Sequence, residues 1–166
     1  FIETICEYRF YTEFQSHEAE FDYLKSLDIN EKINKIAWCQ RVNDAHLLLT
    51  TNDKTVKLWK IKERDVHSVI ENNSSINKKL AQTDVRIPIT LPKTVKKEPA
   101  ITAAPKRSYP NAHAYHIHSI STSPDGELFL SADDLRVNLW DMSRSEQSFN
   151  IVDLKPPNIE SLKEVI

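Results

Sequence analysis

The sequence predicts an all-β protein built from repeated antiparallel sheets. Apolar and polar residues alternate in short runs, which is typical of strands that bury one face. A repeat pairs TTNDKTVKLWK at residues 50–60 with SADDLRVNLWD at residues 131–141. Between two of the runs, Ser-Pro-Asp-Gly at residues 123–126 predicts a tight turn, because Pro presets φ and Gly accepts a positive φ.

The alternating runs follow one order in both halves of the chain. They cover residues 34–38, 46–50 and 55–61 in the first half, and 117–122, 127–131 and 135–142 in the second, with a fourth run at 148–154. Pro156 and Pro157 end this last run. Asn158 is then placed to cap a short helix over residues 159–166.

Composition indicates one intracellular domain. The chain has 166 residues, of which 40% are hydrophobic and 28% charged, with a net charge of −2. No apolar run is long enough to span a membrane and no leader pattern is present, so no membrane partner is expected. Cys6 and Cys39 are too few for a disulfide framework, and we expect them to be reduced core thiols. The expected location is the cytoplasm, with the nucleus as a second one.

Charge is unevenly distributed along the chain. Eight acidic residues fall within residues 1–31 and eight basic residues within 78–107. The basic stretch belongs to an excursion, residues 62–110, that is polar and contains five prolines between 88 and 110. Because Pro removes a ladder donor, we expect no continuous sheet there. Val85–Leu91 is the predicted strand of an extended hairpin whose other strand starts near Lys62.

The repeat resembles a WD repeat, the four-stranded blade of a β-propeller. An Asp precedes a Trp by the same interval in both copies, Asp53 to Trp59 and Asp134 to Trp140. An Asp in the turn between two strands accepts from backbone N–H groups and from a His on the loop entering the blade, here His113. Trp59 and Trp140 would bury a large apolar body and keep one donor to satisfy.

Two features of this repeat carry further expectations. The first copy has Ile29 where the His would fall, so its network is expected to be incomplete. In the second copy the Asp is doubled, as Asp133 and Asp134. One of the two carboxylates should build the turn and the other should face solvent, and the sequence leaves open which does which.

The spacing of the two copies sets the expected domain organisation. It is about twice the roughly 40–45 residues of a blade, so the first blade should carry the excursion between its last two strands. We expect residues 1–61 to form the end of one blade and most of the next, and 111–154 to form a WD blade. Residues 155–166 are the expected linker with its short helix. So few blades do not close a ring, which makes the sequence an expected piece of a longer propeller.

Three segments carry a more specific resemblance. FDYLKSLDINEKIN at 21–34, NAHAYHIHSISTSPDGELFLSADDLRVNLW at 111–140 and SFNIVD at 148–153 are similar to segments of the WD-repeat, B-type regulatory subunits of protein phosphatase 2A. Members of that family are seven-bladed propellers, so the chain would supply about two to three blades. The resemblance implies a non-catalytic regulator that docks on the pair of scaffold and catalytic subunits. In the family, a hairpin of the second of the seven blades reaches the scaffold subunit.

The same resemblance implies how substrates are recruited. An acidic groove on the propeller would bind phosphoproteins that carry basic residues near the phosphosite. Matched position by position, the residues of the groove and its rim would be Asp133, Asp134, Tyr115, His116, Phe21, Asp28 and Leu162. The chain departs from the family at Asn30, where a carboxylate is usual, and in the excursion, which is hardly recognisable.

Other classes of function are less well supported by the residues. His113, His116 and His118 suggest a metal site, but no Cys is near and His113 has a structural role, so we expect no metal or cofactor. Adjacent Asp residues on a strand point to opposite faces, which is unsuitable for catalysis. The lysines of the excursion have one aromatic neighbour, Tyr109, so nucleic-acid binding is not expected. A generic WD-repeat interaction scaffold without a phosphatase link remains the alternative.

Overall fold

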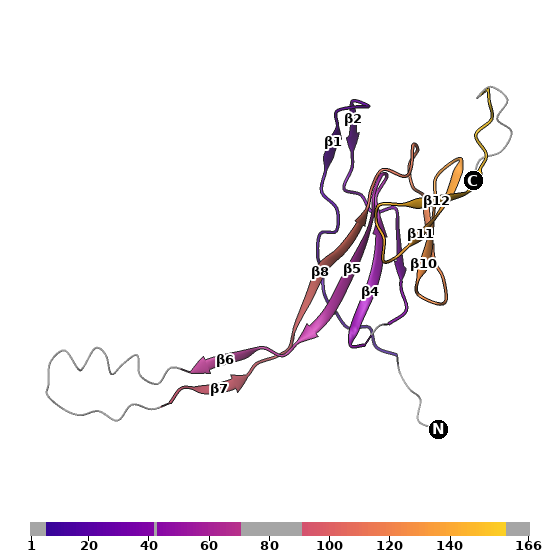
Figure 1. Ribbon diagram of the computed structural model, residues 1–166. Helices are drawn as coiled ribbons and strands as arrows, with labels where there is room; N and C mark the ends of the chain where they lie inside the picture. The colour runs from indigo at the N-terminus through magenta and orange to yellow at the C-terminus, as the bar shows by residue number, and fades with distance from the viewer. Residues whose placement is uncertain (1–5, 42, 71–90, 159–166) are drawn as a thin grey trace, which may run out of the picture. The chain divides into compact units, whose positions relative to one another are not determined.

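The computed structural model describes residues 6–41, 43–70 and 91–158 of the chain. The chain divides into two compact units, the first formed by Phe1–Lys62 with Thr102–Ile166 and the second by Glu63–Ile101. Every regular element in the described part is a strand, and the strands pair antiparallel (Figure 1). Together with the WD-like sheets described below, this confirms the predicted all-β class.

The first four-stranded sheet has the order β3-β4-β5-β8. Its strands are β3 (Lys35–Trp38), β4 (Ala45–Thr51), β5 (Val56–Arg64) and β8 (Ala100–Tyr109). Central strand β4 is apolar along most of its length and buried there, and it pairs with β5 so that Leu49 lies opposite Leu58. The third and fourth strands of this sheet, β5 and β8, are thus neighbours in the sheet although most of the second unit separates them in sequence.

Strand β8 differs from the sequence expectation for the excursion. Residues 100–109 form one continuous strand although Pro105 lies within it. The strand is the last in the sheet order, and an edge strand tolerates a residue without a backbone donor. Of the expected excursion, residues 62–110, residues 102–109 belong to the first compact unit.

The second four-stranded sheet has the order β12-β11-β10-β9. Its strands are β9 (Ser119–Thr122), β10 (Leu128–Ala132), β11 (Arg136–Asp141) and β12 (Ser148–Asp153). The turn between β9 and β10 closes through the Gly126 N–H, which donates to the Ser123 carbonyl at 3.1 Å. Gly126 has a φ of 74°, the left-handed conformation for which glycine is suited.

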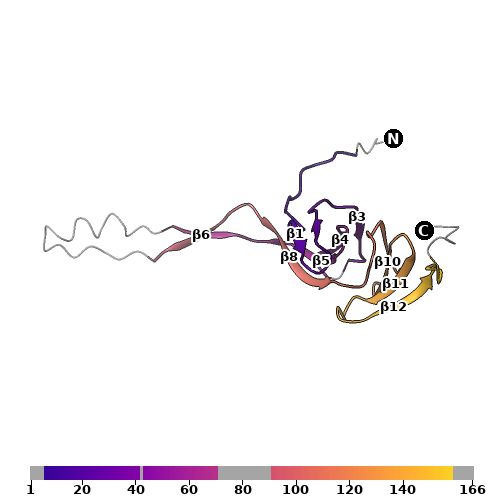
Figure 2. The ribbon, with the colours of Figure 1, turned by 90° about the horizontal axis from the view of Figure 1, so that it is seen from above.

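One hydrophobic core joins the two sheets, which lie side by side in Figure 2. Leu49 and Leu58 from the first sheet pack in one cluster with Phe129 and Trp140 from the second. Tyr109, at the end of β8, stands edge-on to both of these aromatic rings and donates its hydroxyl to the Met142 carbonyl at 2.8 Å. Tyr109, the last residue of β8, therefore links the first sheet to the second.

A short hairpin precedes the first sheet. It consists of β1 (Glu20–Asp22) and β2 (Leu27–Ile29), with Phe21 opposite Asp28, and Ser26 has a positive φ of 52° in its turn (Figure 1). This hairpin is not among the predicted elements, since its strands are too short to show alternation.

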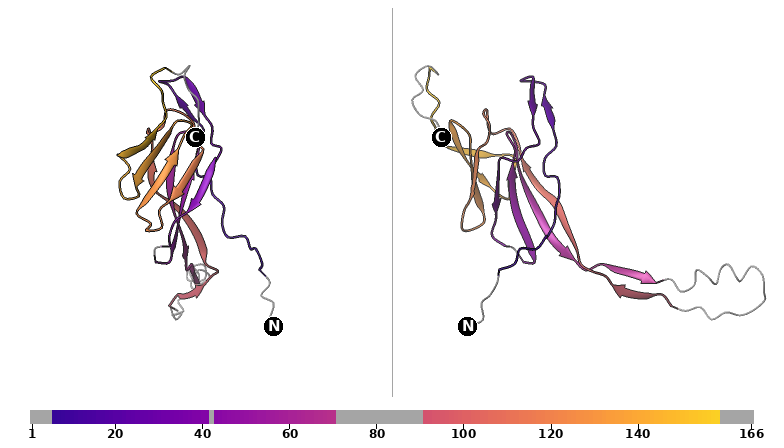
Figure 3. Two further views of the ribbon diagram at one scale, coloured as in Figure 1. Left: turned by 90° about the vertical axis from the view of Figure 1, so that its right-hand side faces the viewer. Right: turned by 180° about the vertical axis from the view of Figure 1, so that it is seen from behind.

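The second unit contains a hairpin of β6 (His67–Ile70) and β7 (Lys93–Lys96), seen as paired strands in Figure 3. The Lys97 N–H donates to the Val66 carbonyl at 2.7 Å, and Lys96 pairs with Asp65 at 2.9 Å. The strand expected at Val85–Leu91 lies outside the described residues apart from Leu91, which is in no strand. The expected helix over 159–166 also lies outside them. No described helix is long and apolar enough to span a membrane.

Candidate functional site

The doubled aspartate lies in the turn between β10 and β11, and its first member builds that turn. Asp133 is buried, with 1% of its surface exposed. Its Oδ1 accepts from the N–H groups of Leu135 at 2.9 Å and Arg136 at 2.7 Å, and its Oδ2 accepts from His113 Nδ1 at 2.8 Å. This carboxylate therefore satisfies three donors at once.

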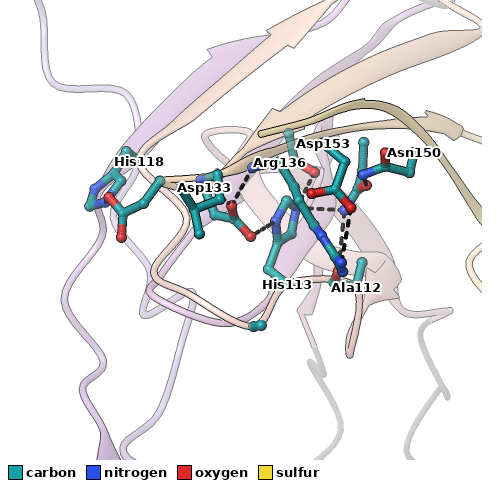
Figure 4. Close-up of polar contacts among 12 residues, drawn as sticks. Ala112, His113, His118, Asp133, Arg136, Asn150 and Asp153 are labelled. Atoms are coloured by element: carbon teal, nitrogen blue, oxygen red, sulfur yellow. Dashed lines mark hydrogen bonds and ion pairs between the residues drawn. The ribbon is translucent and has the colours of Figure 1, made fainter. Parts of the chain in front are cut away.

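The network continues from His113 into the core, as Figure 4 shows in part. His113 Nε2 lies 2.6 Å from the Ser131 hydroxyl, which accepts from Trp140 Nε1 at 2.9 Å. Burial raises the pKa of Asp133, but the N–H of Leu135, the His113 imidazole and the N–H of Arg136 outweigh it and hold that pKa below its usual range. The carboxylate is thus kept ionised inside the protein.

Asp134 has a different environment. Its side chain is 39% exposed, and its Oδ1 lies 2.7 Å from His118 Nε2. The equal intervals to Trp aligned Asp134 with Asp53, which would have made Asp134 the turn residue. The structure assigns the turn to Asp133 instead, because only the first residue of the turn has its side chain directed back onto the following N–H groups.

In the first four-stranded sheet, which is the first blade, Asn52 has the turn role that Asp133 has in the second sheet, the second blade. Asn52 Oδ1 accepts from the N–H groups of Lys54 at 3.1 Å and Thr55 at 2.8 Å. The expected turn role of Asp53 is therefore wrong. Asp53 instead accepts from Asn34 Nδ2 at 2.7 Å, and its carbonyl accepts from the Ile117 N–H at 2.9 Å, which links the two sheets.

Residues before the β1–β2 hairpin complete the network of the first blade. Trp59 Nε1 donates to Ser16 Oγ at 2.9 Å, and that hydroxyl lies 2.6 Å from Thr50 Oγ1. His17 is buried, and its Nε2 lies 3.0 Å from the Thr55 carbonyl. The expectation of an incomplete network, based on Ile29, missed these residues because the hairpin separates them from the blade in sequence.

A small pocket of about 70 Å³ lies beside the β1–β2 hairpin. Three predicted groove residues line it, Asp28 from the hairpin and Tyr115 with His116 from the segment before β9. Lys25 of the hairpin donates from Nζ to the Ala114 carbonyl at 3.3 Å, which ties the two walls together. The structure thus brings together residues that are far apart in sequence.

The remaining predicted groove residues lie elsewhere. Phe21, on β1, is half exposed and packs edge-on against Tyr23, and Asp134 is outside the pocket lining. Leu162 lies outside the described residues. Trp59, His113 and Trp140 are buried in the two networks described above.

The charge of the pocket is mixed rather than purely acidic. Asp22, Asp28 and Asp53 line it together with Lys25 and Lys54. Asp22 pairs with Lys54, whose hydrogen bond is the main cause of a lowered pKa at that carboxyl. One of the three carboxylates of the pocket is therefore paired with a cation, which neither composition nor spacing could reveal.

The cysteines and histidines show no catalytic or metal-binding arrangement in the part of the chain that the structure describes. Cys39 is half buried, and burial raises the pKa of its thiol to about 11. Cys6 is exposed, so its expected place in the core is wrong. Among the described residues, no three His, Cys, Asp or Glu side chains are grouped to hold a metal ion.

Comparisons with known proteins agree with the fold. The family model "WD domain, G-beta repeat" matches residues 104–141, from within β8 through β11. The chain is 56% identical over 97% of its length to the B-type regulatory subunit of protein phosphatase PP2A from Schizosaccharomyces pombe, and covers 35% of that protein. The corresponding protein of Candida tropicalis is 57% identical over 97% of the chain, which covers 32% of it.

A third relative comes from an animal. "Protein phosphatase PP2A 55 kDa regulatory subunit" of Drosophila melanogaster is 54% identical over 96% of the chain, which again covers 32% of the relative. The chain therefore spans about a third of the length of these curated relatives. The similarity runs through nearly the whole chain, so the chain is similar to about a third of the B-type regulatory subunits of protein phosphatase 2A and contains a WD repeat like the one that the family model describes.

Proposed function

We propose that this chain provides the substrate-capturing and docking part of a non-catalytic regulatory subunit of protein phosphatase 2A. One observation supports capture above others. Asp133 alone satisfies the donors of the β10–β11 turn, so the neighbouring Asp134 keeps an exposed carboxylate without a role in that turn. The names of the relatives support the link to the phosphatase.

Capture would be electrostatic. An exposed carboxylate attracts a Lys or Arg side chain near the phosphosite of a substrate. Tyr115 is 38% exposed, and its ring offers a cation–π surface for a further basic side chain of the substrate. Asp28 and His116, which line the pocket with Tyr115, would extend the contact along the substrate. Phe21 and Leu162 are the proposed apolar contacts.

Docking is assigned to the second unit. Its described residues include exposed lysines, among them Lys93 on β7 and Lys97 just after it, while Lys96 is paired with Asp65. Exposed cations suit an acidic surface on the scaffold subunit. Holding a substrate beside the catalytic subunit raises its effective concentration and leaves the chemistry to that subunit. This role implies a cytoplasmic location, with the nucleus as a second one.

Charge reversal at Asp134 tests capture separately from docking. We expect Asp134→Lys to weaken binding of a peptide with several lysines by about tenfold or more, because attraction becomes repulsion. Retention of purified scaffold and catalytic subunits should stay unchanged. Asp44→Lys, at an exposed Asp between β3 and β4, is the matched control and should affect neither. Unchanged peptide binding by Asp134→Lys would refute capture through this carboxylate.

A further inference from the structure

The Asp134 carboxylate has a neighbour that the turn does not require. His118 Nε2 lies 2.7 Å from Asp134 Oδ1, and both side chains reach solvent, with 52% and 39% of their surfaces exposed. An ionised carboxylate only accepts, so the imidazole is the donor. The pair therefore places an N–H group on one of the two oxygens that a substrate would use.

The backbone fixes the position of this imidazole. The His118 N–H donates to the Ala132 carbonyl at 2.9 Å, directly before β9 begins, and Ala132 ends the strand that leads into the turn. In Figure 4, His118 lies apart from the buried His113 network. The position of the imidazole thus depends on the sheet, whereas the position of Asp134 depends on the turn that Asp133 builds.

We propose that His118 is a specificity-determining residue that makes the Asp134 site favour Lys over Arg in the substrate. The proposal rests on the proposed function, in which Asp134 captures a basic side chain. It adds that His118 takes one lone pair of Oδ1 and competes with the incoming cation for that oxygen. A group that needs both oxygens is then penalised, and a group that needs one is not.

The two cations differ in this respect. The guanidinium of Arg is a planar fork that binds a carboxylate through two parallel hydrogen bonds, one to each oxygen. The ammonium of Lys is a point charge that is satisfied by a single oxygen and by water. With the imidazole on Oδ1, the second hydrogen bond of Arg has to share that oxygen with the ring and is weakened, while Lys can bind through Oδ2 alone.

The test compares two peptides on variants of the full chain. One fluorescent peptide has lysines as its only charged residues, and its twin has arginine at each of those positions. We expect His118→Ala to tighten binding of the arginine peptide about three- to tenfold relative to the lysine peptide, since the fork no longer shares Oδ1 with the ring. His118→Gln keeps a neutral donor near Oδ1 and should restore the original ratio. His67→Ala, at an exposed His of the second unit, should leave the ratio unchanged.

A second variant, Asp134→Asn, distinguishes the role of His118 from capture by Asp134. In Asp134→Asn, His118→Ala should no longer alter the ratio, because His118 acts through the carboxylate. Equal changes for both peptides in His118→Ala, or no change, would overturn the role of His118 alone. If Asp134→Asn binds both peptides as well as the unsubstituted chain does, capture through Asp134 is refuted instead.

Discussion

At the scale of single residues, two adjacent aspartates have opposite environments. Asp133 is buried and accepts hydrogen bonds from three donors. The side chain of Asp134 is partly exposed and contacts His118, which is also exposed to solvent. The difference follows from the turn, which can direct only one side chain onto its own backbone N–H groups. In the proposed function, Asp133 therefore stabilises the turn and Asp134 captures the substrate.

This division predicts unequal costs for two alanine substitutions. Asp133→Ala leaves two backbone N–H groups and the His113 imidazole without their acceptor, so we expect a loss of about 2–5 kcal/mol in the free energy of unfolding. Asp134→Ala should change it by no more than about 0.5 kcal/mol. Urea denaturation followed by circular dichroism measures both. Equal losses would show that both carboxylates support the turn.

A second prediction at this scale concerns pH. Burial, together with the nearby positive charge of Lys57, lowers the pKa of His17 from its ordinary value of 6.5, although the Thr55 carbonyl opposes this. Below pH 6.5 the unfolded chain therefore binds a proton that the folded chain does not, and stability should fall with falling pH between 6.5 and the lowered value.

The matched variant for this prediction is His17→Gln, whose amide can still donate to the Thr55 carbonyl but does not titrate. Urea midpoints taken across this pH range should decline less steeply for His17→Gln than for the unsubstituted chain. Parallel declines would mean that other groups govern the acid sensitivity.

At the scale of elements, β5 and β8 hold together the two residues of the first unit that flank the second unit in sequence. These are Lys62 and Thr102, and Thr102 Oγ1 donates to the Lys62 carbonyl at 3.1 Å. A short hairpin turn in place of residues 63–101 should preserve the blades. Far-UV circular dichroism and peptide binding test this, while retention of the scaffold and catalytic subunits should be lost.

The elements also show what the sequence could predict. Strands β3, β4, β5 and β9–β12 coincide with the alternating runs. Strands β10 and β11 show the reason most clearly, because their residues alternate between buried and partly buried positions. Strand β8 was missed because Pro105 argues against a strand, and its edge position cannot be seen in sequence.

Within the site, the sequence could not show which residues lie close together in space. The importance of the doubled aspartate was visible, but which carboxylate faces solvent depends on backbone direction in the turn. His17 serves the first blade from beyond an inserted hairpin, so no fixed spacing marks it. The pairing of Asp22 with Lys54 likewise joins residues whose proximity only the fold creates.

At the scale of the whole molecule, the described part of the first unit leaves apolar side chains exposed on both sheets. Ile36 and Trp38 on β3, and Phe149 and Ile151 on β12, are each more than half exposed. Exposed apolar residues on an edge strand such as β12 favour self-association. We therefore expect Phe149→Thr with Ile151→Thr to lower concentration-dependent light scattering while the circular dichroism spectrum is kept.

Retention of purified scaffold and catalytic subunits of protein phosphatase 2A by the immobilised, folded chain tests the central claim most directly. We predict that the unsubstituted chain and Asp134→Lys both retain the pair, and that the chain lacking residues 63–101 does not. A folded chain that retains neither subunit would contradict the account, and would favour an interaction scaffold without a phosphatase link.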